Sequence, residues 1–340
     1  MKVLGFEFAP LEVPFERRKQ TAGVAIWMWI FMALTPMTLT ILIGLLFTSY
    51  WWITLAYATY YFFDRDICNR GGRRSEWVRN WWCWKSMADY FPITLVKTTE
   101  LSPDENYIFG CHPHGILPAG AFTCFATEAC NFSKVFPGIK PTLLSLHGNF
   151  LSPGFRDIFL MASAASASGA SINHLLGRYG AKGEAICLVI GGAAESLYCR
   201  PSDVIKIILK PRKGFIKMAL RHGASLVPVF SFGETEVYDQ FDNPEGSIVR
   251  WVQEKFRKRF GLAPPLFHGR GIFQYTFGLL PHRKPISVVV GGPIKVVKKE
   301  DFTRQDVDEI HADYTKALAE LFEAHKEKYF PNRNLKLEIL

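Results

Sequence analysis

The sequence predicts an α/β fold, a mixed sheet with flanking helices, preceded by an N-terminal transmembrane helical hairpin. Residues 20–63 contain no Asp, Glu, Lys, Arg or His, which gives an uncharged run of 44 residues. From about Thr94 onward, short apolar runs that end in Gly or Pro alternate with amphipathic helical stretches. We therefore expect three parts: a cytosolic N-terminal segment at 1–19, a two-span membrane hairpin at 20–63, and a membrane-associated α/β domain facing the cytosol at 64–340.

The uncharged run is long enough for two membrane spans, because a bilayer core needs about 20 apolar residues per helix. Tyr50-Trp51-Trp52 is expected near the turn of the hairpin, since Tyr and Trp favour the membrane interface. Arg17-Arg18-Lys19 precedes the run, and arginines follow it from Arg65 to Arg74. Positive charge on both flanks indicates that both ends are cytosolic, which a hairpin satisfies and a single span does not. The alternative is an apolar helical hairpin buried inside a soluble protein.

Two segments after the hairpin allow more than one interpretation. The four tryptophans between Trp77 and Trp84 stand beside Arg79 and Lys85, which is typical either of a helix on the membrane surface or of a helix that packs its indoles into the core. Residues 161–171 are almost all Ala, Ser or Gly. We expect a tightly packed helix there, with a flexible loop as the alternative.

The regular elements of the α/β domain follow from apolar periodicity. Three β-like runs are expected at 186–190, 225–230 and 286–290. Helices are expected at 213–222 and at 306–329, the second starting at a capping box formed near Thr303 and Asp306.

Composition and charge narrow the function classes. A hydrophobic content of 49% excludes a disordered chain. The net charge is +9, of which residues 64–340 carry +8, so the partners to consider are anionic lipid, a phosphate-rich ligand and nucleic acid. Nucleic acid is not expected, because there is no zinc-finger spacing, RNP-like sequence or basic helical stripe. The seven cysteines contain no CxxC pair, which argues against a disulfide framework or a structural zinc site.

The sequence Cys111-His112-Pro113-His114-Gly115 is the strongest chemical signal in the chain. It follows a short β-like run, and imidazole is the side chain best suited to accept a proton near neutral pH. Proline stiffens the backbone and glycine allows a close turn, so that one histidine can be aimed into a pocket. A metal site and two buried structural histidines are the alternatives, although no further ligands stand at a supporting spacing.

Two further segments carry candidate site residues. Gly191-Gly192 directly follows the run at 186–190 and opens room for a ligand at the end of that strand, with Glu195 at its mouth. Arg212 and Lys213 stand where a helix is expected to begin, and cations there oppose the helix dipole unless an anion is near. A phosphate-bearing ligand is therefore one interpretation, and a solvated basic face is the other.

Taken together, these motifs closely resemble the type-two diacylglycerol acyltransferase family, which includes the monoacylglycerol acyltransferases and the wax synthases. The resemblance covers nearly the whole chain. The segments at 7–11, 71–74 and 273–275 are most similar to the monoacylglycerol branch, whereas Gly191 to Leu197 is equally similar to the diacylglycerol branch. The residues that carry it are Phe8-Ala9-Pro10-Leu11, Glu16-Arg17-Arg18, Gly71-Gly72-Arg73-Arg74, Tyr90-Phe91-Pro92, His112-Pro113-His114-Gly115, Phe155-Arg156-Asp157, Gly191 to Leu197, Arg212 to Glu234, Phe267-His268-Gly269-Arg270-Gly271, Phe273-Gln274-Tyr275 and Leu321 to Lys326.

The resemblance implies a glycerolipid-acyltransferase-like fold and acyl transfer from acyl-CoA to the free hydroxyl of monoacylglycerol or diacylglycerol. It implies an enzyme of the endoplasmic reticulum membrane, and of lipid droplets as a second location. Acyl-CoA is then a substrate, with no cofactor and no metal, and the acylglycerol and the bilayer are the other partners; a homo-oligomer stays open.

The resemblance and the chemistry together suggest roles for the candidate residues. His114 would be the general base, and His112 would shape the motif or share that role, with Glu195 orienting the base or the acceptor. Backbone amides at Gly115, Gly191 and Gly192 would stabilise the oxyanion, and Arg212, Lys213 and Lys217 would meet the CoA phosphates.

Four alternatives accompany this interpretation. Cys111 could act as a nucleophile through an acyl-enzyme. The acceptor could be a fatty alcohol, as for a wax-ester synthase. The chain could be a non-enzymatic lipid-binding scaffold, or a metal-dependent hydrolase that uses His112 and His114.

Overall fold

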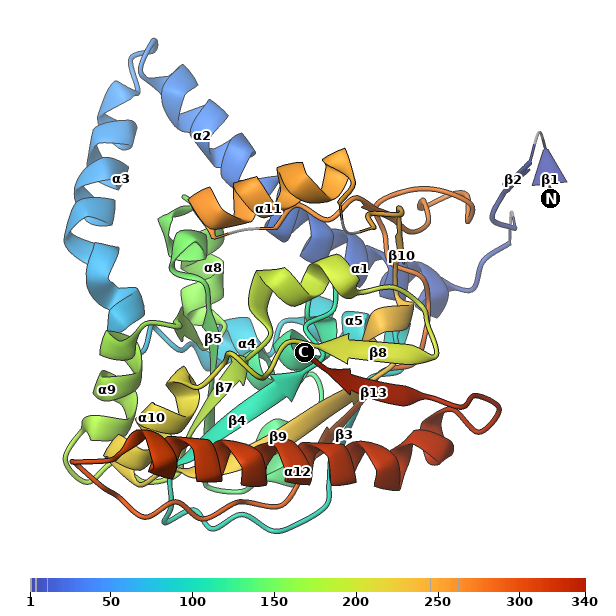
Figure 1. Ribbon diagram of the computed structural model, residues 1–340. Coiled ribbons are helices and arrows are strands. Elements are labelled where there is room, and N and C mark those ends of the chain that lie inside the picture. Colours follow the sequence, from blue (N-terminus) through green and yellow to red (C-terminus); the bar gives the residue numbers. More distant parts are fainter. Residues whose placement is uncertain (1, 4, 11, 245, 262) are drawn as a thin grey trace.

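A seven-stranded mixed sheet forms the centre of the protein. The computed structural model describes residues 2–340 apart from residues 4, 11, 245 and 262 (Figure 1). Five neighbouring strands run parallel, and the two at one edge run the opposite way. In spatial order the strands are β3 (Thr94–Lys97), β12 (Ser287–Val290), β9 (Ser225–Phe232), β4 (Tyr107–His112), β7 (Glu184–Val189), β5 (Lys140–Ser145) and β6 (Ala164–Ser166). The mixed α/β sheet is therefore confirmed, and the three expected β-like runs are β7, β9 and β12.

The strand β6 corrects in part the expectation of a helix or a loop at residues 161–171, since Met161 ends one helix, residues 164–166 form the strand and residues 169–171 begin another helix. It pairs with β5 at the edge of the sheet, with Leu143 opposite Ala164, before helix α9 begins at Gly169. The three strand residues are fully buried, and another segment crosses them closely: a Cβ at Gly72 would lie 2.5 Å from the Ala164 carbonyl oxygen. The middle of the small-residue run is therefore a buried edge strand.

Side chains alternate between two helical layers, one on each face of the sheet. Along β4, Phe109 packs into the first layer and Ile108 into the second, as the period of two requires. The first layer holds α1 (Phe15–Met32), α4 (Glu76–Arg79), α5 (Trp82–Tyr90), α6 (Ala119–Ala121) with the π-helical turn η2 (Phe122–Ala126), α7 (Phe132–Val135) and α8 (Phe155–Met161). The second holds α9 (Gly169–Gly177), α10 (Gly214–His222), α12 (Arg304–Tyr329) and the pair β8 (Val204–Ile207) and β13 (Lys336–Ile339).

The other elements outside the N-terminal hairpin are short, apart from the 13-residue helix α11. They are β1 (Lys2–Val3), β2 (Phe6–Glu7), η1 (Arg65–Asn69), η3 (His147–Leu151), η4 (Gly192–Tyr198), η5 (Glu234–Glu236), β10 (Asp239–Gln240), α11 (Ile248–Phe260) and β11 (Phe267–His268).

Both predicted helices of the second layer are present. Helix α10 ends at His222 and is capped by Gly223, whose φ of +65° is a left-handed conformation that glycine adopts without strain. Helix α12 begins at the predicted capping box. There the Thr303 hydroxyl accepts the Asp306 N–H at 3.1 Å, and the Asp306 carboxylate accepts the Thr303 N–H at 2.6 Å.

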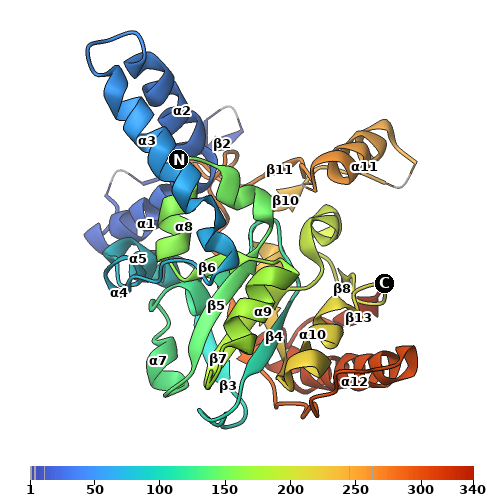
Figure 2. The same ribbon diagram turned by 90° about the vertical axis from the view of Figure 1, so that its left-hand side faces the viewer.

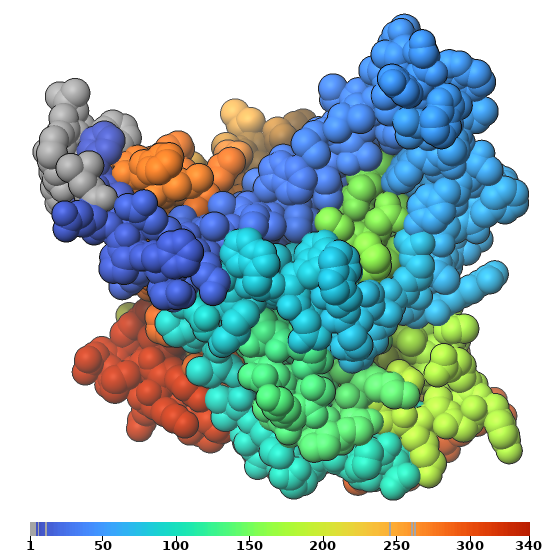
Figure 3. Space-filling model, turned by 180° about the vertical axis from the view of Figure 1, so that it is seen from behind, coloured from blue at the N-terminus to red at the C-terminus, as the bar shows by residue number. Residues whose placement is uncertain are grey.

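The N-terminal hairpin is shorter than the predicted segment at 20–63. Its arms are α2 (Leu34–Leu45) and α3 (Trp51–Asp64), which stand out from the domain with Tyr50-Trp51-Trp52 at the turn as expected (Figures 1 and 2). Helix α1, which precedes them, packs on α5 so closely that a Cβ at Gly23 would lie 2.7 Å from the Cys83 carbonyl oxygen. The first part of the uncharged run is therefore buried against the domain, and Figure 3 shows α1 lying across it.

No individual helix among the described residues is both long and apolar enough to cross a bilayer. Helices α1 and α2 meet the length and composition required when taken together, although they are bent by 57° at Ala33.

One part of the tryptophan-rich segment packs into the core, and another part is exposed. Helix α4 ends at Arg79 and α5 starts at Trp82, so the segment is two short helices and not one. Trp84 is buried and donates its indole N–H to the Val78 carbonyl oxygen at 2.7 Å, whereas Trp77 and Trp82 are exposed.

Candidate active site

Three loops that follow neighbouring parallel strands form the candidate site. His112 is the last residue of β4 and the loop after it carries His114, the loop after β7 carries Glu195, and the loop after β9 carries Glu234. Because β9, β4 and β7 are adjacent, the carboxyl ends of these strands meet at one edge of the sheet, where open α/β sheets bind ligands. The structure thus places the predicted histidines, Gly191-Gly192 and Glu195 at one edge.

His112 is fully buried and hydrogen-bonded to helix α12. The Tyr314 hydroxyl donates to the Gly110 carbonyl oxygen at 3.1 Å, so its oxygen must accept the Nε2–H of His112, also at 3.1 Å. The Nδ1 atom of His112 then carries a lone pair, and it has no hydrogen-bond partner among the described residues. Burial lowers the pKa of His112 to about 3, so the ring is neutral at physiological pH.

His114 is half-buried and presents its own lone pair. Its Nδ1 lies 3.0 Å from the Gly115 carbonyl oxygen, which can only accept, so Nδ1 carries the proton and Nε2 carries the lone pair. No residue in the described part of the chain hydrogen-bonds to that Nε2. Burial also lowers the pKa of His114, so the imidazole is neutral and its Nε2 lone pair is unprotonated. Both histidines thus have a free basic nitrogen, but only the ring of His114 is partly open.

Glu195 fixes the backbone of the histidine loop and does not contact an imidazole. Its two carboxylate oxygens each accept one amide, from His114 at 2.5 Å and from Ile208 at 2.7 Å. The carboxyl group is buried, and desolvation raises its pKa to about 7 against the opposing effect of these two hydrogen bonds and of Arg212. A Cβ at Gly191 would lie 1.9 Å from this carboxylate, so only glycine leaves room for it.

Glu234 is a second buried carboxylate on the other side of the same loop, and the sequence analysis gave it no role. It accepts the Ala119 amide at 2.7 Å and the Gly120 amide at 3.0 Å, and burial raises its pKa to about 8. Gly115, with φ of +72°, lies so close that a Cβ there would be 2.9 Å from the Glu234 side chain. The histidine loop is therefore held between two buried glutamates.

A sequence signal existed for Glu234 but not for Tyr314. Glu234 follows Gly233 at the end of an apolar strand, the same arrangement that singled out Glu195. Tyr314 belongs to the apolar face of α12, where nothing in the sequence separates it from its core neighbours.

The three glycines predicted for the oxyanion are not equivalent. The Gly115 amide is directed at the buried Cys199 thiol. Within the described chain, the amides of Gly191 and Gly192 have no hydrogen-bond acceptor. These two amides precede and begin η4, where the first N–H groups of a helical turn lack internal partners.

The three predicted cations lie at the start of α10 but differ in their surroundings. Arg212 donates to the Gly191 carbonyl oxygen at 3.0 Å, and its buried Nε has no partner among the described residues. Lys213 is paired with Asp308 of α12 at 2.6 Å. Lys217 follows one turn later and is exposed. Arg212 is therefore the cation that joins this group to the Gly191-Gly192 turn.

Cys111 and possible metal ligands complete the description of the site. Cys111 is buried, and burial together with the charge of Glu234 raises its pKa far above the usual range, so it is a neutral thiol. In the part of the chain that the structure describes, no three His, Cys, Asp or Glu residues lie close enough to hold a metal ion.

Comparisons with known proteins agree with the resemblance seen in the sequence. The family model for diacylglycerol acyltransferase matches residues 43–340. The chain is 48% identical over 323 residues to 2-acylglycerol O-acyltransferase 1 of Bos taurus, covering 95% of this chain and 96% of the relative. It is 49% identical over 315 residues to diacylglycerol O-acyltransferase 2 of Homo sapiens, covering 92% and 81%. No solved structure matches the chain. The chain belongs to the diacylglycerol acyltransferase family.

Proposed function

We propose that this chain is an acyl-CoA-dependent O-acyltransferase that esterifies the free hydroxyl of monoacylglycerol, diacylglycerol or both. The products are then diacylglycerol or triacylglycerol. The observation that carries the proposal is the neutral, half-buried His114, whose Nε2 has no protein partner in the described chain. Relatives named for 2-acylglycerol and for diacylglycerol are equally similar to the chain, which supports either acceptor.

The proposed chemistry is direct transfer in one tetrahedral intermediate. His114 Nε2 takes the proton of the acceptor hydroxyl as its oxygen attacks the thioester carbonyl carbon. The amides of Gly191 and Gly192 stabilise the oxyanion that forms. The intermediate collapses with breakage of the C–S bond, and the proton on His114 passes to the departing sulfur, which gives the ester and free CoA. Glu195 acts as a positioning residue through the His114 backbone.

We propose that the CoA phosphates bind at the start of α10. Arg212 carries a buried Nε that has no partner among the described residues, and a phosphate oxygen can accept its N–H. Lys213 and Lys217 extend this positive charge along one face of the helix, because they are four residues apart.

The acceptor and product are bilayer lipids, which gives the hairpin its proposed role. Its surface is apolar and exposed, including Ile41, Ile43, Leu46 and Phe47. We place α2 and α3 in the endoplasmic reticulum membrane, with the two ends of the chain on the cytosolic side because a hairpin returns to the side it entered. Lipid droplets are the proposed second location. Arms of 12 and 14 residues measure about 18 and 21 Å, shorter than the roughly 30 Å hydrocarbon core of a bilayer, and α1, which would lengthen α2, is buried against α5.

The experiment that tests this function supplies each acceptor in turn. The chain is expressed in cells that lack neutral-lipid synthases, and their membranes receive labelled acyl-CoA with monoacylglycerol, diacylglycerol or a fatty alcohol. Labelled diacylglycerol or triacylglycerol, with CoA released in step and activity unchanged by chelators, is the expected result. Wax ester as the sole product would favour the fatty-alcohol alternative, and no acyl-CoA-dependent product would favour a lipid-binding scaffold.

A further inference from the structure

Three motifs that the catalytic site leaves unused meet in one cavity. It is a half-open cavity of about 310 Å³, bordered by the segment before α1, the first turns of α1, and residues 270–283. The residues that line it are Pro10, Glu12, Val13, Pro14, Arg17, Thr21, Arg270, Tyr275 and Arg283. Arg17, Arg270 and Tyr275 come from three separate motifs of the sequence, and the histidine loop contributes none of the lining.

The two inner arginines are held in place by aromatic rings. Arg283 lies 4.1 Å from the Tyr90 ring centroid, and Arg270 lies 4.4 Å from that of Tyr275 and 5.7 Å from that of Tyr90. Tyr90 is itself fixed, because its hydroxyl donates to the Pro281 carbonyl oxygen at 2.6 Å. Stacking on a ring leaves the edge of a guanidinium free to donate to a bound group.

The three arginines of the cavity are unneutralised. Within the described residues, no carboxylate forms an ion pair with Arg17, Arg270 or Arg283, and the buried Nε of Arg283 has no hydrogen-bond partner. Arg283 reaches the side-chain oxygen of Gln20, a neutral group. The pKa of Arg283 is lowered, chiefly by burial and also by the neighbouring arginines, as expected of cations crowded without a counter-ion. Glu12 is the one acidic residue in the lining.

A second cavity of similar size shows that this lack of neutralisation is unusual here. That cavity, of about 300 Å³, contains Arg200, Lys206 and Arg250 in its lining. Each of them has an acidic partner: Asp242 at 2.9 Å for Arg200, Glu338 at 3.3 Å for Lys206, and Glu254 at 3.0 Å for Arg250. The arginine cavity therefore has a place for an anion that the other cavity lacks.

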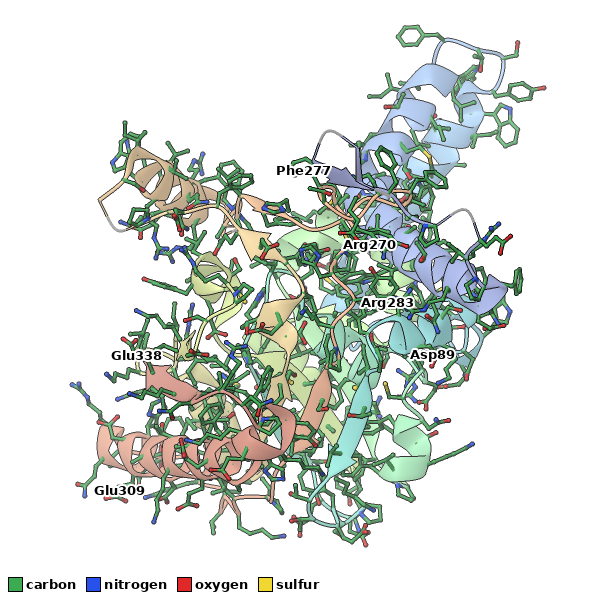
Figure 4. The ribbon with its side chains drawn as sticks, turned by 90° about the vertical axis from the view of Figure 1, so that its right-hand side faces the viewer. Asp89, Arg270, Phe277, Arg283, Glu309 and Glu338 are labelled. Carbon is green, nitrogen blue, oxygen red and sulfur yellow. The ribbon has the colours of Figure 1, made fainter. Side chains whose placement is uncertain are left out.

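An exposed apolar rim accompanies the arginines. Phe273 and Phe277 are 78% and 53% exposed, and Leu279 beside them is also exposed. The rim is tied to the N-terminal segment, since Ala9 donates its amide to the Phe273 carbonyl oxygen at 2.9 Å. Figure 4 shows Phe277 on the side of the projecting hairpin, with Arg270 and then Arg283 farther from that side. Apolar groups thus lie toward the proposed bilayer and cations lie behind them.

We propose that Arg17, Arg270 and Arg283 bind the phosphate of an anionic phospholipid whose acyl chains lie along the rim formed by Phe273 and Phe277. The paired N–H donors of a guanidinium match the oxygens of a phosphate. Three arginines against one glutamate leave a positive charge that suits a headgroup of one to two negative charges. A water-soluble phosphate would gain nothing from the apolar rim, which is why the lipid is the favoured source. The site is separate from the acyl-CoA phosphates at Arg212, and it does not depend on acyl transfer.

The test measures thermal unfolding of the purified full chain in detergent with four probes: dioctanoyl phosphatidate, dioctanoyl phosphatidylcholine, CoA and inorganic phosphate. The phosphatidylcholine has the same acyl chains as the phosphatidate but a headgroup with no net charge. A ligand that binds the folded state raises the melting temperature. We expect phosphatidate to raise it by about 2 °C or more, and phosphatidylcholine and inorganic phosphate to raise it by less than half as much. Equal effects of phosphatidate and phosphatidylcholine, or of phosphatidate and inorganic phosphate, would overturn the proposal.

Variants locate the effect. R270Q/R283Q and the milder R17Q, which changes an exposed side chain, should each lose most of the phosphatidate shift and keep the CoA shift. R270K/R283K should recover part of the phosphatidate shift, because lysine keeps the positive charge but lacks the planar, paired N–H donors of arginine. The charge-matched control R304Q/K316Q, on α12 at the other end of the molecule, should keep the full shift. A phosphatidate shift that survives R17Q and R270K/R283K unchanged, or a CoA shift that disappears in them, would contradict the lipid site.

Discussion

The carboxylate of Glu195 binds the backbone of His114 and not its imidazole, with the amide N–H donating to Oε1 at 2.5 Å. The other oxygen accepts the Ile208 amide, so Glu195 ties the histidine loop to the end of β8. The base is therefore positioned through its main chain, and its ring orientation comes from its own hydrogen bond to the Gly115 carbonyl oxygen.

The first prediction concerns Glu195→Gln. Both carboxylate oxygens accept amides, so glutamine must turn its NH₂ toward one of two donors, which costs about 1–3 kcal/mol. We expect kcat to fall about tenfold to a hundredfold, with the KM for acyl-CoA little changed. Steady-state kinetics in membranes measure kcat and KM. Glu100→Gln, which removes the carboxylate of an exposed ion pair, is the control. An undiminished rate would remove Glu195 from the mechanism.

The second prediction separates the two histidines through Tyr314→Phe. This change removes the acceptor of the buried His112 Nε2–H, so we expect a loss of about 1–2 kcal/mol in stability. The kcat should fall less than about threefold, because His112 is not the base. Tyr329→Phe is the matched control on the same helix, since the Tyr329 hydroxyl has no partner in the described chain. A kcat reduced as severely as by Glu195→Gln would instead point to His112.

The third prediction concerns Cys111→Ala. The thiol is buried and its pKa is raised well above the usual range, so almost no thiolate exists to attack a thioester. We expect the variant to keep most of the wild-type kcat, as should Cys187→Ala, which alters another buried thiol on the neighbouring strand. Turnover lost only in Cys111→Ala would support the acyl-enzyme alternative.

The fourth prediction is a fall in stability as the pH rises from about 6.5 to about 8.5. Burial raises the pKa of Glu195 to about 7 and that of Glu234 to about 8, so the folded chain holds protons that the unfolded chain releases near its ordinary pKa. Stability from these groups is present at low pH and is lost as the pH rises through about 8. The lowered pKa of His112 has the opposite effect, but only below about 6.5.

Thermal melting across this pH range measures the effect. We expect the melting temperature to fall by about 2 °C or more between the two ends of the range. Glu234→Gln has no carboxyl group to titrate and should show a smaller fall. A melting temperature that stays level or rises toward pH 8.5 would contradict the raised pKa values.

Much of the fold was predictable because local signals agreed with the tertiary structure. The apolar runs that became β7 and β9 are buried on both faces, and the Thr303–Asp306 capping box is complete within four residues. The extent of the hairpin was not predictable, because the apolar residues of α1 satisfy a membrane and a protein core equally well. Packing of Gly23 against α5 decides between them, and that contact joins segments about 60 residues apart.

The candidate site was likewise predictable only in part. His114 and Glu195 follow strand ends beside glycines, and Arg212 stands at the start of a predicted helix, and both patterns are visible in the sequence. The partner of Glu195 could not be predicted, because a carboxylate near a histidine suggests contact with the ring, whereas the backbone geometry offers it two amides. The His112–Tyr314 hydrogen bond joins residues 202 positions apart, and its tyrosine looks like any core residue of an amphipathic helix.

The most direct test of the central claim, that His114 is the general base, is the acyl-transfer rate of His114→Ala in membranes containing equal amounts of each protein. We expect the rate to fall by at least about a hundredfold, with expression and membrane association unchanged, because a positioned general base contributes about 10²–10⁴. His112→Ala, assayed beside it, should retain more activity than His114→Ala. Acyl transfer by His114→Ala at close to the wild-type rate would contradict the account.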